Sequence, residues 1–180
     1  MSRPATLLVI GIHREELAFG QAVAVGLDPA SVQVLVIPDG LSGRHPRADQ
    51  RFHWDTLHRA LYLQLRPHVR RGHRLLIDLH TGIDQAAPCA DLYSRDPARL
   101  TAALAGGRDT LAPPPRLISL GDAVTGPGAQ TIIPEAVWND PDCLYVGMEI
   151  YLAEPGPGRP AEREYARALI ATLADAERAG

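Results

Sequence analysis

Hydrophobic runs and amphipathic stretches alternate along the first half of the chain. Mainly apolar stretches at residues 5–11, 32–37 and 75–80, the last beginning with three apolar residues in a row, are typical of strands buried on both faces. Between them, residues 15–27 and 52–69 carry apolar side chains at helical spacing. The resulting β-α-β-α-β order favours right-handed crossovers between parallel strands. We therefore expect the carboxyl ends of these three strands to meet at one edge of a sheet.

The second half of the chain has shorter apolar segments. A helix is predicted over residues 96–104, because Asp96 and Pro97 suit its N-cap and first position. A short strand is expected at residues 116–120, then a long loop over 121–142. Residues 144–152 alternate strictly between two faces, as a strand does, and residues 160–179 predict a closing helix. These elements indicate one α/β domain over residues 1–180.

Composition and charge narrow the classes of protein. All 18 basic residues are arginine, but they are scattered and the net charge is −3, which argues against a nucleic-acid partner. The two cysteines have no CxxC spacing and no secretory leader precedes them, which favours a reducing cytoplasm. No apolar run approaches the length that spans a membrane.

The strand at residues 75–80 ends in chemically active side chains. Asp78 and His80 are two residues apart and therefore share one face of the strand. We read Thr81 and Gly82 as the turn that follows. Ligands of open α/β sheets bind just beyond the carboxyl ends of the strands. A histidine that merely ends a strand is the simpler interpretation of His80 taken alone.

A second pair follows the first strand. His13 and Glu16 are three residues apart at the start of a helix, so they can point the same way. Taken alone they are ordinary for a first helical turn, where acidic residues are favoured. Together with His80 they form the His₂Glu set that catalytic zinc uses. Asp78 is then suited to hold His80 through its other ring nitrogen.

Three motifs, in this order, resemble a known family. They are Gly11-x-His13-x-x-Glu16, then Asp78-Leu79-His80, then Val146-Gly147-Met148-Glu149. This arrangement is similar to the succinylglutamate desuccinylase/aspartoacylase family of the zinc carboxypeptidase superfamily. The resemblance implies a compact three-layer α/β/α fold with a mixed, mostly parallel central sheet. It also implies one zinc ion per chain, held by His13, Glu16 and His80, with Glu149 as the catalytic carboxylate.

Glu149 is also unusual on its own terms. It is a charged residue in the middle of an otherwise apolar strand, where burying a carboxylate is unfavourable unless it has a partner or a function. A carboxylate beside an activated water can accept its proton and pass it to the departing nitrogen. The alternative is a glutamate on a solvent-facing side, next to Tyr145 and Tyr151.

An arginine-rich segment corresponds to the substrate-binding region of the family. Relatives carry Asp-Leu-Asn-Arg where this chain has Ala48-Asp49-Gln50-Arg51. The resemblance assigns Arg51 to a substrate carboxylate, which guanidinium binds bidentately, with Gln50 in place of the usual asparagine. Arg44 is the candidate for polarising the scissile carbonyl, and Arg47 is its alternative. A solvated basic loop is the simpler interpretation of Arg44 and Arg47.

Tyr151 completes the candidate residues. It stands two residues beyond Glu149, where the family commonly has glycine, and we assign it to substrate binding. Together the motifs favour a zinc-dependent hydrolase that cleaves an amide bond of a small, carboxylate-bearing substrate by metal-activated water. An N-acyl amino acid deacylase is the first hypothesis. A metallocarboxypeptidase acting on a C-terminal peptide bond, and a non-catalytic relative that binds zinc or ligand, remain alternatives.

Overall fold

The computed structural model describes residues 4–43, 46–69, 72–83, 89–106, 111–121, 128–129 and 131–179. A sheet runs through the middle of this part of the chain, with strand order β2-β1-β3-β7-β4-β5-β6. The strands are β1 (Thr6–Ile10), β2 (Val32–Val36), β3 (Leu75–Ile83), β4 (Ala90–Ser94), β5 (Arg116–Leu120), β6 (Gly128–Ala129) and β7 (Leu144–Leu152).

The direction of the strands is mixed but mostly parallel. β1, β2 and β3 run the same way, so their carboxyl ends lie at one edge, as expected, and β7 runs parallel to β3 and joins them there. β4 is antiparallel to β7, and β5 and β6 run parallel to β4. The central pair is β3 and β7, whose register sets His80 opposite Glu149.

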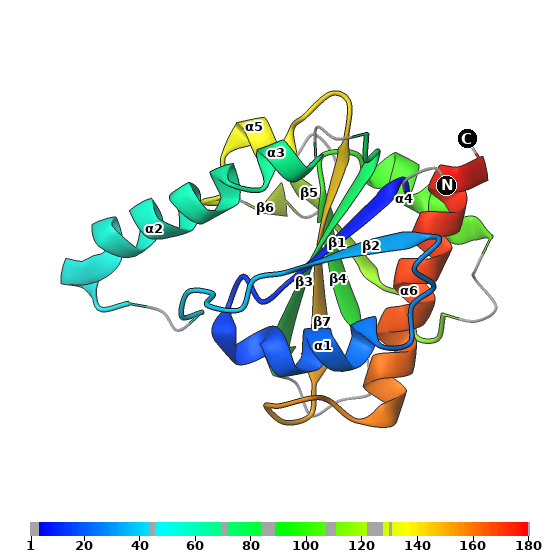
Figure 1. Cartoon of the computed structure of the whole chain (residues 1–180), viewed down its shortest axis with the longest axis horizontal. Helices are drawn as coiled ribbons and strands as arrows, with labels where there is room; N and C mark the ends of the chain where they lie inside the picture. Colours follow the sequence, from blue (N-terminus) through cyan, green and yellow to red (C-terminus); the bar gives the residue numbers. More distant parts are fainter. Residues whose placement is uncertain are drawn as a thin grey trace.

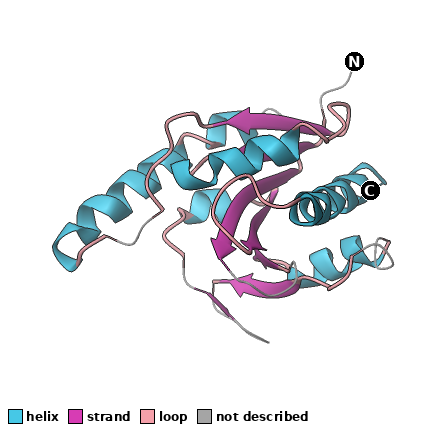
Figure 2. Ribbon diagram, turned by 90° about the horizontal axis from the view of Figure 1, so that it is seen from below, coloured by secondary structure: helices cyan, strands magenta, loops and turns pink. Residues whose placement is uncertain are grey.

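Helices cover both faces of the sheet (Figures 1 and 2). On one face lie α1 (Leu17–Ala24), α4 (Pro97–Ala105) and α6 (Pro160–Ala179). On the other lie α2 (Arg51–Leu63), α3 (Arg66–Val69) and α5 (Glu135–Trp138), and α2 extends away from the strands. Two short 3₁₀ helices, η1 (Arg14–Glu16) and η2 (Ala48–Gln50), precede α1 and α2. The expected three-layer α/β/α fold is confirmed.

Alternating strand residues build the two hydrophobic layers. Leu8, Ile77 and Val146 pack with buried residues of α1, α4 and α6, such as Leu169. Their neighbours in sequence, such as Leu7 and Leu76, point to the opposite layer, where they pack with residues from the α2, α3 and α5 side. Because side chains alternate along a strand, a sheet covered on both faces needs continuous apolar runs. The central strands therefore read as unbroken hydrophobic segments in the sequence.

The helix expected over residues 52–69 is two helices, α2 and α3. Pro67 has no N–H to donate to the carbonyl of Leu63, the last residue of α2, so a continuous helix would lose a hydrogen bond there. Leu65 is buried between the two helices, whereas Leu57, one of the apolar residues at helical spacing in this segment, is 42% exposed.

Three other expectations need correction. Thr81 and Gly82 are not a turn, because β3 continues to Ile83 and pairs with β7 along its whole length. The expected loop at 121–142 contains α5 and β6, and residues 122–127 and 130 lie outside the described part. β4 was not predicted at all.

Among the described residues, no helix is both long and apolar enough to cross a membrane.

Candidate metal centre

His13 and Glu16 are positioned by the turn that leaves β1. Gly11 begins this turn with φ +85°, a conformation that side chains with a β-carbon rarely adopt. A β-carbon there would also lie 2.5 Å from the carbonyl oxygen of Ile37, so glycine permits the close approach. The chain then enters η1, with His13 at its N-cap and Glu16 at its last residue. This places both side chains at the carboxyl edge of the sheet.

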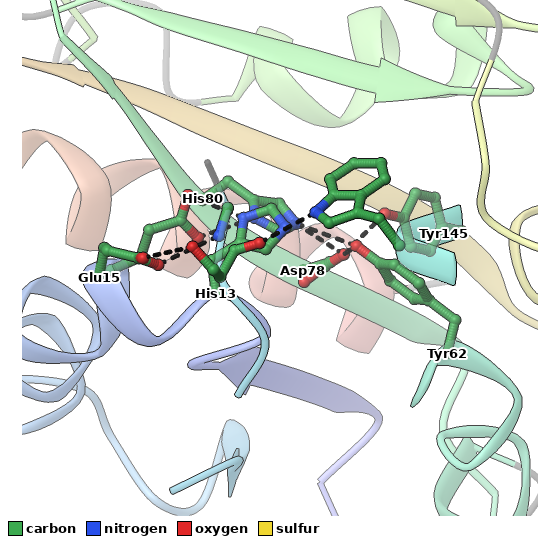
Figure 3. Close-up of polar contacts among 10 residues, drawn as sticks. His13, Glu15, Tyr62, Asp78, His80 and Tyr145 are labelled. Carbon is green, nitrogen blue, oxygen red and sulfur yellow. Dashed lines mark hydrogen bonds and ion pairs between the residues drawn. The ribbon is translucent and has the colours of Figure 1, made fainter. Parts of the chain in front are cut away.

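The side chains of His13, Glu16 and His80 converge at this edge, and Figure 3 shows His13 beside His80. One oxygen of Glu16 lies 3.1 Å from Nδ1 of His13, and the other lies 2.9 Å from Nδ1 of His80. One ligand atom from each residue falls within 4.8 Å of the others. The exposed fractions of the three side chains are 20%, 12% and 17%, so the cluster is largely shielded from solvent.

Asp78 contacts the ring nitrogen of His80 that points away from Glu16. The Oδ2 atom of Asp78 lies 2.9 Å from Nε2 of His80. The same oxygen accepts hydrogen bonds from the hydroxyls of Tyr62 at 2.8 Å and Tyr145 at 2.9 Å. Asp78 is completely buried, and a buried carboxylate requires such partners. The ring of His80 is therefore oriented with Nδ1 toward Glu16 and Nε2 toward Asp78.

The side chains of this cluster shift one another's pKa values. Burial tends to raise the pKa of Glu16, but hydrogen bonds from His13 and His80 outweigh it and lower that pKa to about 2. Burial tends to lower the pKa of His80, but the charge and hydrogen bond of Asp78, with those of Glu16, raise it well above its ordinary value. Asp78 and Glu16 thus favour a proton on the His80 ring when no metal is bound.

The donor set fits a zinc ion. Two imidazole nitrogens and one carboxylate are the protein ligands of a common catalytic zinc site, which keeps one position open. Asp78 on the far nitrogen of His80 supplies the outer carboxylate that such ligand histidines usually have. The ligand atoms of these three side chains already lie within 4.8 Å of one another, as binding of one divalent cation requires.

A short segment closes over His13. Glu15 accepts hydrogen bonds from the Ser42 hydroxyl at 2.8 Å and from the backbone N–H of Gly43 at 3.1 Å. A β-carbon at Gly43 would lie 2.9 Å from the ring of His13, so glycine lets the backbone pass directly beside the imidazole. Glu15 thus fixes residues 42–43 against the cluster.

A cavity of about 500 Å³ opens beside the three candidate ligands. Its described lining also includes Glu149, Tyr93, Tyr62 and Tyr145. Other lining residues are mostly apolar or aromatic, namely Trp54, Leu120, Ile132 and Ile133. The cavity therefore combines a polar end at the sheet with an apolar wall, as small-molecule sites commonly do.

Glu149 lies in this cavity on β7, opposite His80 on β3. Burial raises its pKa, while the nearby His80 and a hydrogen bond from Tyr93 act in the opposite direction. The Tyr93 hydroxyl lies 3.2 Å from Oε2 of Glu149. A partly buried carboxylate with a raised pKa, beside a candidate metal cluster, is suited to proton transfer.

The arginine-rich segment lies apart from the described cavity lining. Arg47, Gln50 and Arg51 are exposed at the start of α2, and none of them is among the lining residues that the structure describes. Arg44 lies outside the described residues. The hydroxyl of Tyr151 donates to Asp91 at 2.8 Å, and Tyr151 does not belong to the described lining either.

Several residues of the cavity were not predicted from the sequence. His58 is buried, with its ring 5.4 Å from that of His13 and 3.8 Å from that of Trp54. Burial lowers its pKa. The alternation of β7 already placed Tyr145 on the face of Glu149, so that residue could have been found. His58 and Tyr93 come from α2 and β4, whose positions depend on long-range packing.

Comparisons with known proteins support the fold. No family model and no curated protein matches the sequence. The structure is similar to a succinylglutamate desuccinylase from Chromobacterium violaceum, at 15% identity and a TM-score of 0.53. It is also similar to a bacteriophage poly-gamma-glutamate hydrolase, at 13% identity and a TM-score of 0.52. The chain has the zinc carboxypeptidase-like fold.

The similarity spans only part of the length of some of these neighbours. The similarity covers 96% of this chain but 62% of the desuccinylase chain. For murine aminoacylase 3, at 17% identity and a TM-score of 0.49, the shares are 97% and 65%. The chain therefore spans less than two thirds of these two proteins. For the phage hydrolase the shares are 99% and 87%.

Proposed function

We propose that this protein is a zinc-dependent hydrolase that cleaves an amide bond of a small substrate. The observation that carries the proposal is that one cavity contains both a His₂Glu set and a separate carboxylate. His13, Glu16 and His80 offer ligand atoms within 4.8 Å of one another, and Glu149 lines the same cavity. Two imidazoles and one carboxylate suit zinc, and Glu149 is a further carboxylate that does not belong to this ligand set.

Each side chain then has a chemical task. When bound, zinc would supply Lewis acidity and lower the pKa of a water molecule toward ~7. Glu149 accepts the proton of the attacking water and returns it to the departing nitrogen. Asp78 keeps the Nδ1 atom of His80 directed at the metal position. Arg44 remains our candidate for stabilising the oxyanion, a task that suits a guanidinium.

The substrate that we propose is an N-acyl amino acid. Two structural neighbours are named a succinylglutamate desuccinylase and a poly-gamma-glutamate hydrolase. Both names specify an activity on acyl derivatives of amino acids. Arg51, with Gln50 and Arg47, remains the candidate for a substrate carboxylate, and Tyr151 for a further contact. A C-terminal peptide bond is the second candidate, because it offers the same carboxylate beside an amide.

A non-catalytic role as a zinc- or ligand-binding protein is the alternative from another class. The observation that favours it is the exposed position of Arg47, Gln50 and Arg51, which the described cavity lining does not include. Such a protein would bind zinc and substrate-like acids but would have no turnover.

A hydrolysis assay with two proteins separates these possibilities. Wild type and Glu149→Gln, both loaded with zinc, are incubated with N-acetyl and N-succinyl amino acids and with dipeptides. We expect wild type to release the amino acid from at least one acyl compound. Glu149→Gln should retain its zinc but lose ~10²–10⁴-fold in kcat, as expected when a general base is removed. No turnover by wild type on any compound, with zinc bound, would favour the binding protein.

A further inference from the structure

The hydroxyl of Tyr93 lies between two carboxylates. It is 3.2 Å from Oε2 of Glu149 and 3.4 Å from Oδ2 of Asp91. The antiparallel pairing of β4 with β7 produces this arrangement, because it sets Asp91 opposite Glu149 and Tyr93 opposite Gly147.

Asp91 has strong partners of its own. Nε of Arg116 donates to one of its oxygens at 2.6 Å, and Nη2 donates to the other at 3.0 Å. The hydroxyl of Tyr151 donates to Asp91 as well, at 2.8 Å. Like charges directly opposite each other in a sheet are unfavourable, and Arg116 neutralises one of this pair. Asp91, which is buried, thus has Arg116 and Tyr151 as hydrogen-bond donors besides Tyr93.

Glu149 has no comparable set of partners. Among the residues that the structure describes, Tyr93 is the hydrogen-bond donor to its carboxylate. Its other oxygen faces Gly82, where a β-carbon would lie 2.9 Å away. Burial, and then the charges of Glu149 and Asp91, raise the pKa of Tyr93, so its hydroxyl keeps its proton. The Tyr93 hydroxyl has a single proton to donate, and Asp91 already accepts hydrogen bonds from Arg116 and Tyr151. Glu149 is therefore the favoured acceptor of the Tyr93 proton.

We propose that Tyr93 is a positioning residue for Glu149. Its hydroxyl holds Oε2 of the carboxylate and so fixes how the carboxylate is oriented in the cavity that the candidate metal ligands also line. Without such a hydrogen bond, the χ3 torsion of a glutamate, which turns the carboxylate, has only broad and weak preferences. A proton acceptor has to lie within hydrogen-bond reach of the proton that it takes. This inference rests on the proposed function, since it gives Glu149 the task of proton transfer.

Tyr93→Phe removes the hydroxyl and leaves the ring. We expect kcat on the best-hydrolysed N-acetyl or N-succinyl amino acid to fall roughly 10-fold or more, the scale of one hydrogen bond to a charged group. KM and zinc content should stay at the wild-type values, because Tyr93 touches neither the metal ligands nor, in this proposal, the substrate. Tyr165→Phe is the matched control. Tyr165 lies on α6, and its hydroxyl donates to the carbonyl of Pro113; kcat should be unchanged when this hydroxyl is deleted.

A double-mutant cycle with Glu149→Gln decides whether Tyr93 acts through Glu149. In the Glu149→Gln protein, Tyr93→Phe should cause no further loss of the residual rate. An equal loss in both backgrounds, or a raised KM with an unchanged kcat, would show that Tyr93 contacts the substrate instead and would overturn the inference. A wild-type kcat for Tyr93→Phe, beside a strong loss for Glu149→Gln, would overturn it while leaving the proposed function intact. If Glu149→Gln itself hydrolyses at the wild-type rate, the proposed function fails, and this inference fails with it.

Discussion

At the scale of single residues, Asp78 connects the core to the candidate metal centre. Its Oδ2 atom accepts hydrogen bonds from Tyr62 and Tyr145 and lies 2.9 Å from Nε2 of His80. The two tyrosines lie in the hydrophobic layer between the sheet and α2, so packing determines where the carboxylate points. The orientation of a metal ligand is therefore set by residues that would not touch the metal.

Tyr145→Phe tests this dependence. Removing the hydroxyl leaves the ring in the core but takes one hydrogen bond from Asp78. Loss of such an outer partner typically weakens metal binding ~10–100-fold. We expect a drop of this size for zinc, measured by competition with a chelator of known affinity. Tyr165→Phe should bind zinc as wild type does. Equal zinc affinities for Tyr145→Phe and wild type would show that Asp78 does not depend on this hydroxyl.

Glu16 makes the metal-free protein sensitive to acid. Its pKa is lowered from 4.5 to about 2 in the folded protein by hydrogen bonds from His13 and His80, which outweigh the effect of burial. A lowered pKa contributes stability that is present above pH 4.5 and is lost as the pH falls toward 2. The contribution is on the order of 3 kcal/mol. Urea unfolding without metal should show stability falling between pH 4.5 and 2 by more in wild type than in Glu16→Gln. Parallel curves for the two proteins would contradict this account of Glu16.

At the scale of elements, the sequence predicted the strands that surround the site. The apolar runs that became β1, β2 and β3 and the alternation of β7 were recognised correctly. β4 was missed because Ala90–Ser94 is short and carries Asp91 among its apolar residues. Its alternation was a usable signal, since Ala90 and Leu92 are buried in the core layer opposite to Tyr93. Its antiparallel insertion beside β7 depends on contacts that are distant in sequence.

The same limit applies to the site. The spacing of His13 and Glu16 and the alternation of Asp78 and His80 are local, so sequence reasoning could group them. Tyr93 reaches the cavity only through the β4–β7 pairing. The roles of Arg51 and Tyr151 came from the family resemblance, and they stay predictions. No local pattern could indicate that the Tyr151 hydroxyl donates to Asp91.

The contact between β3 and β7 offers a prediction of its own. A β-carbon at Gly82 would lie 2.7 Å from a ring carbon of Tyr151 and 2.9 Å from Oε1 of Glu149. Gly82→Ala should therefore displace the Glu149 carboxylate and lower kcat by roughly 10-fold or more, as misplacement of a reacting group does. Zinc content should be retained. Gly106→Ala is the control, because no atom lies within 4 Å of its added carbon. An unchanged kcat for Gly82→Ala would show that Glu149 is not confined from this side.

At the scale of the whole molecule, a metal would join separate parts of the chain. His13 and Glu16 follow β1, whereas His80 lies on β3, 64 residues after Glu16. A ligand that binds only the folded state stabilises it, by ~2.7 kcal/mol at 100 times its Kd. For a chain of this size that corresponds to a rise in Tm of roughly 5–10 °C. We expect a chelator to lower the Tm of zinc-loaded wild type by this amount and to leave that of His80→Ala unchanged. An equal response of the two proteins would place the stabilising metal elsewhere.

The central claim is that zinc binds at the carboxyl edge of the sheet, beside Glu149. X-ray diffraction from crystals of the zinc-loaded protein, collected on both sides of the zinc absorption edge, tests it most directly. We expect one anomalous peak per chain, ~2.0–2.2 Å from a ring nitrogen of His13, from a carboxylate oxygen of Glu16 and from a ring nitrogen of His80. A peak bound by other residues, or no peak at these three side chains in zinc-saturated crystals, would contradict the account.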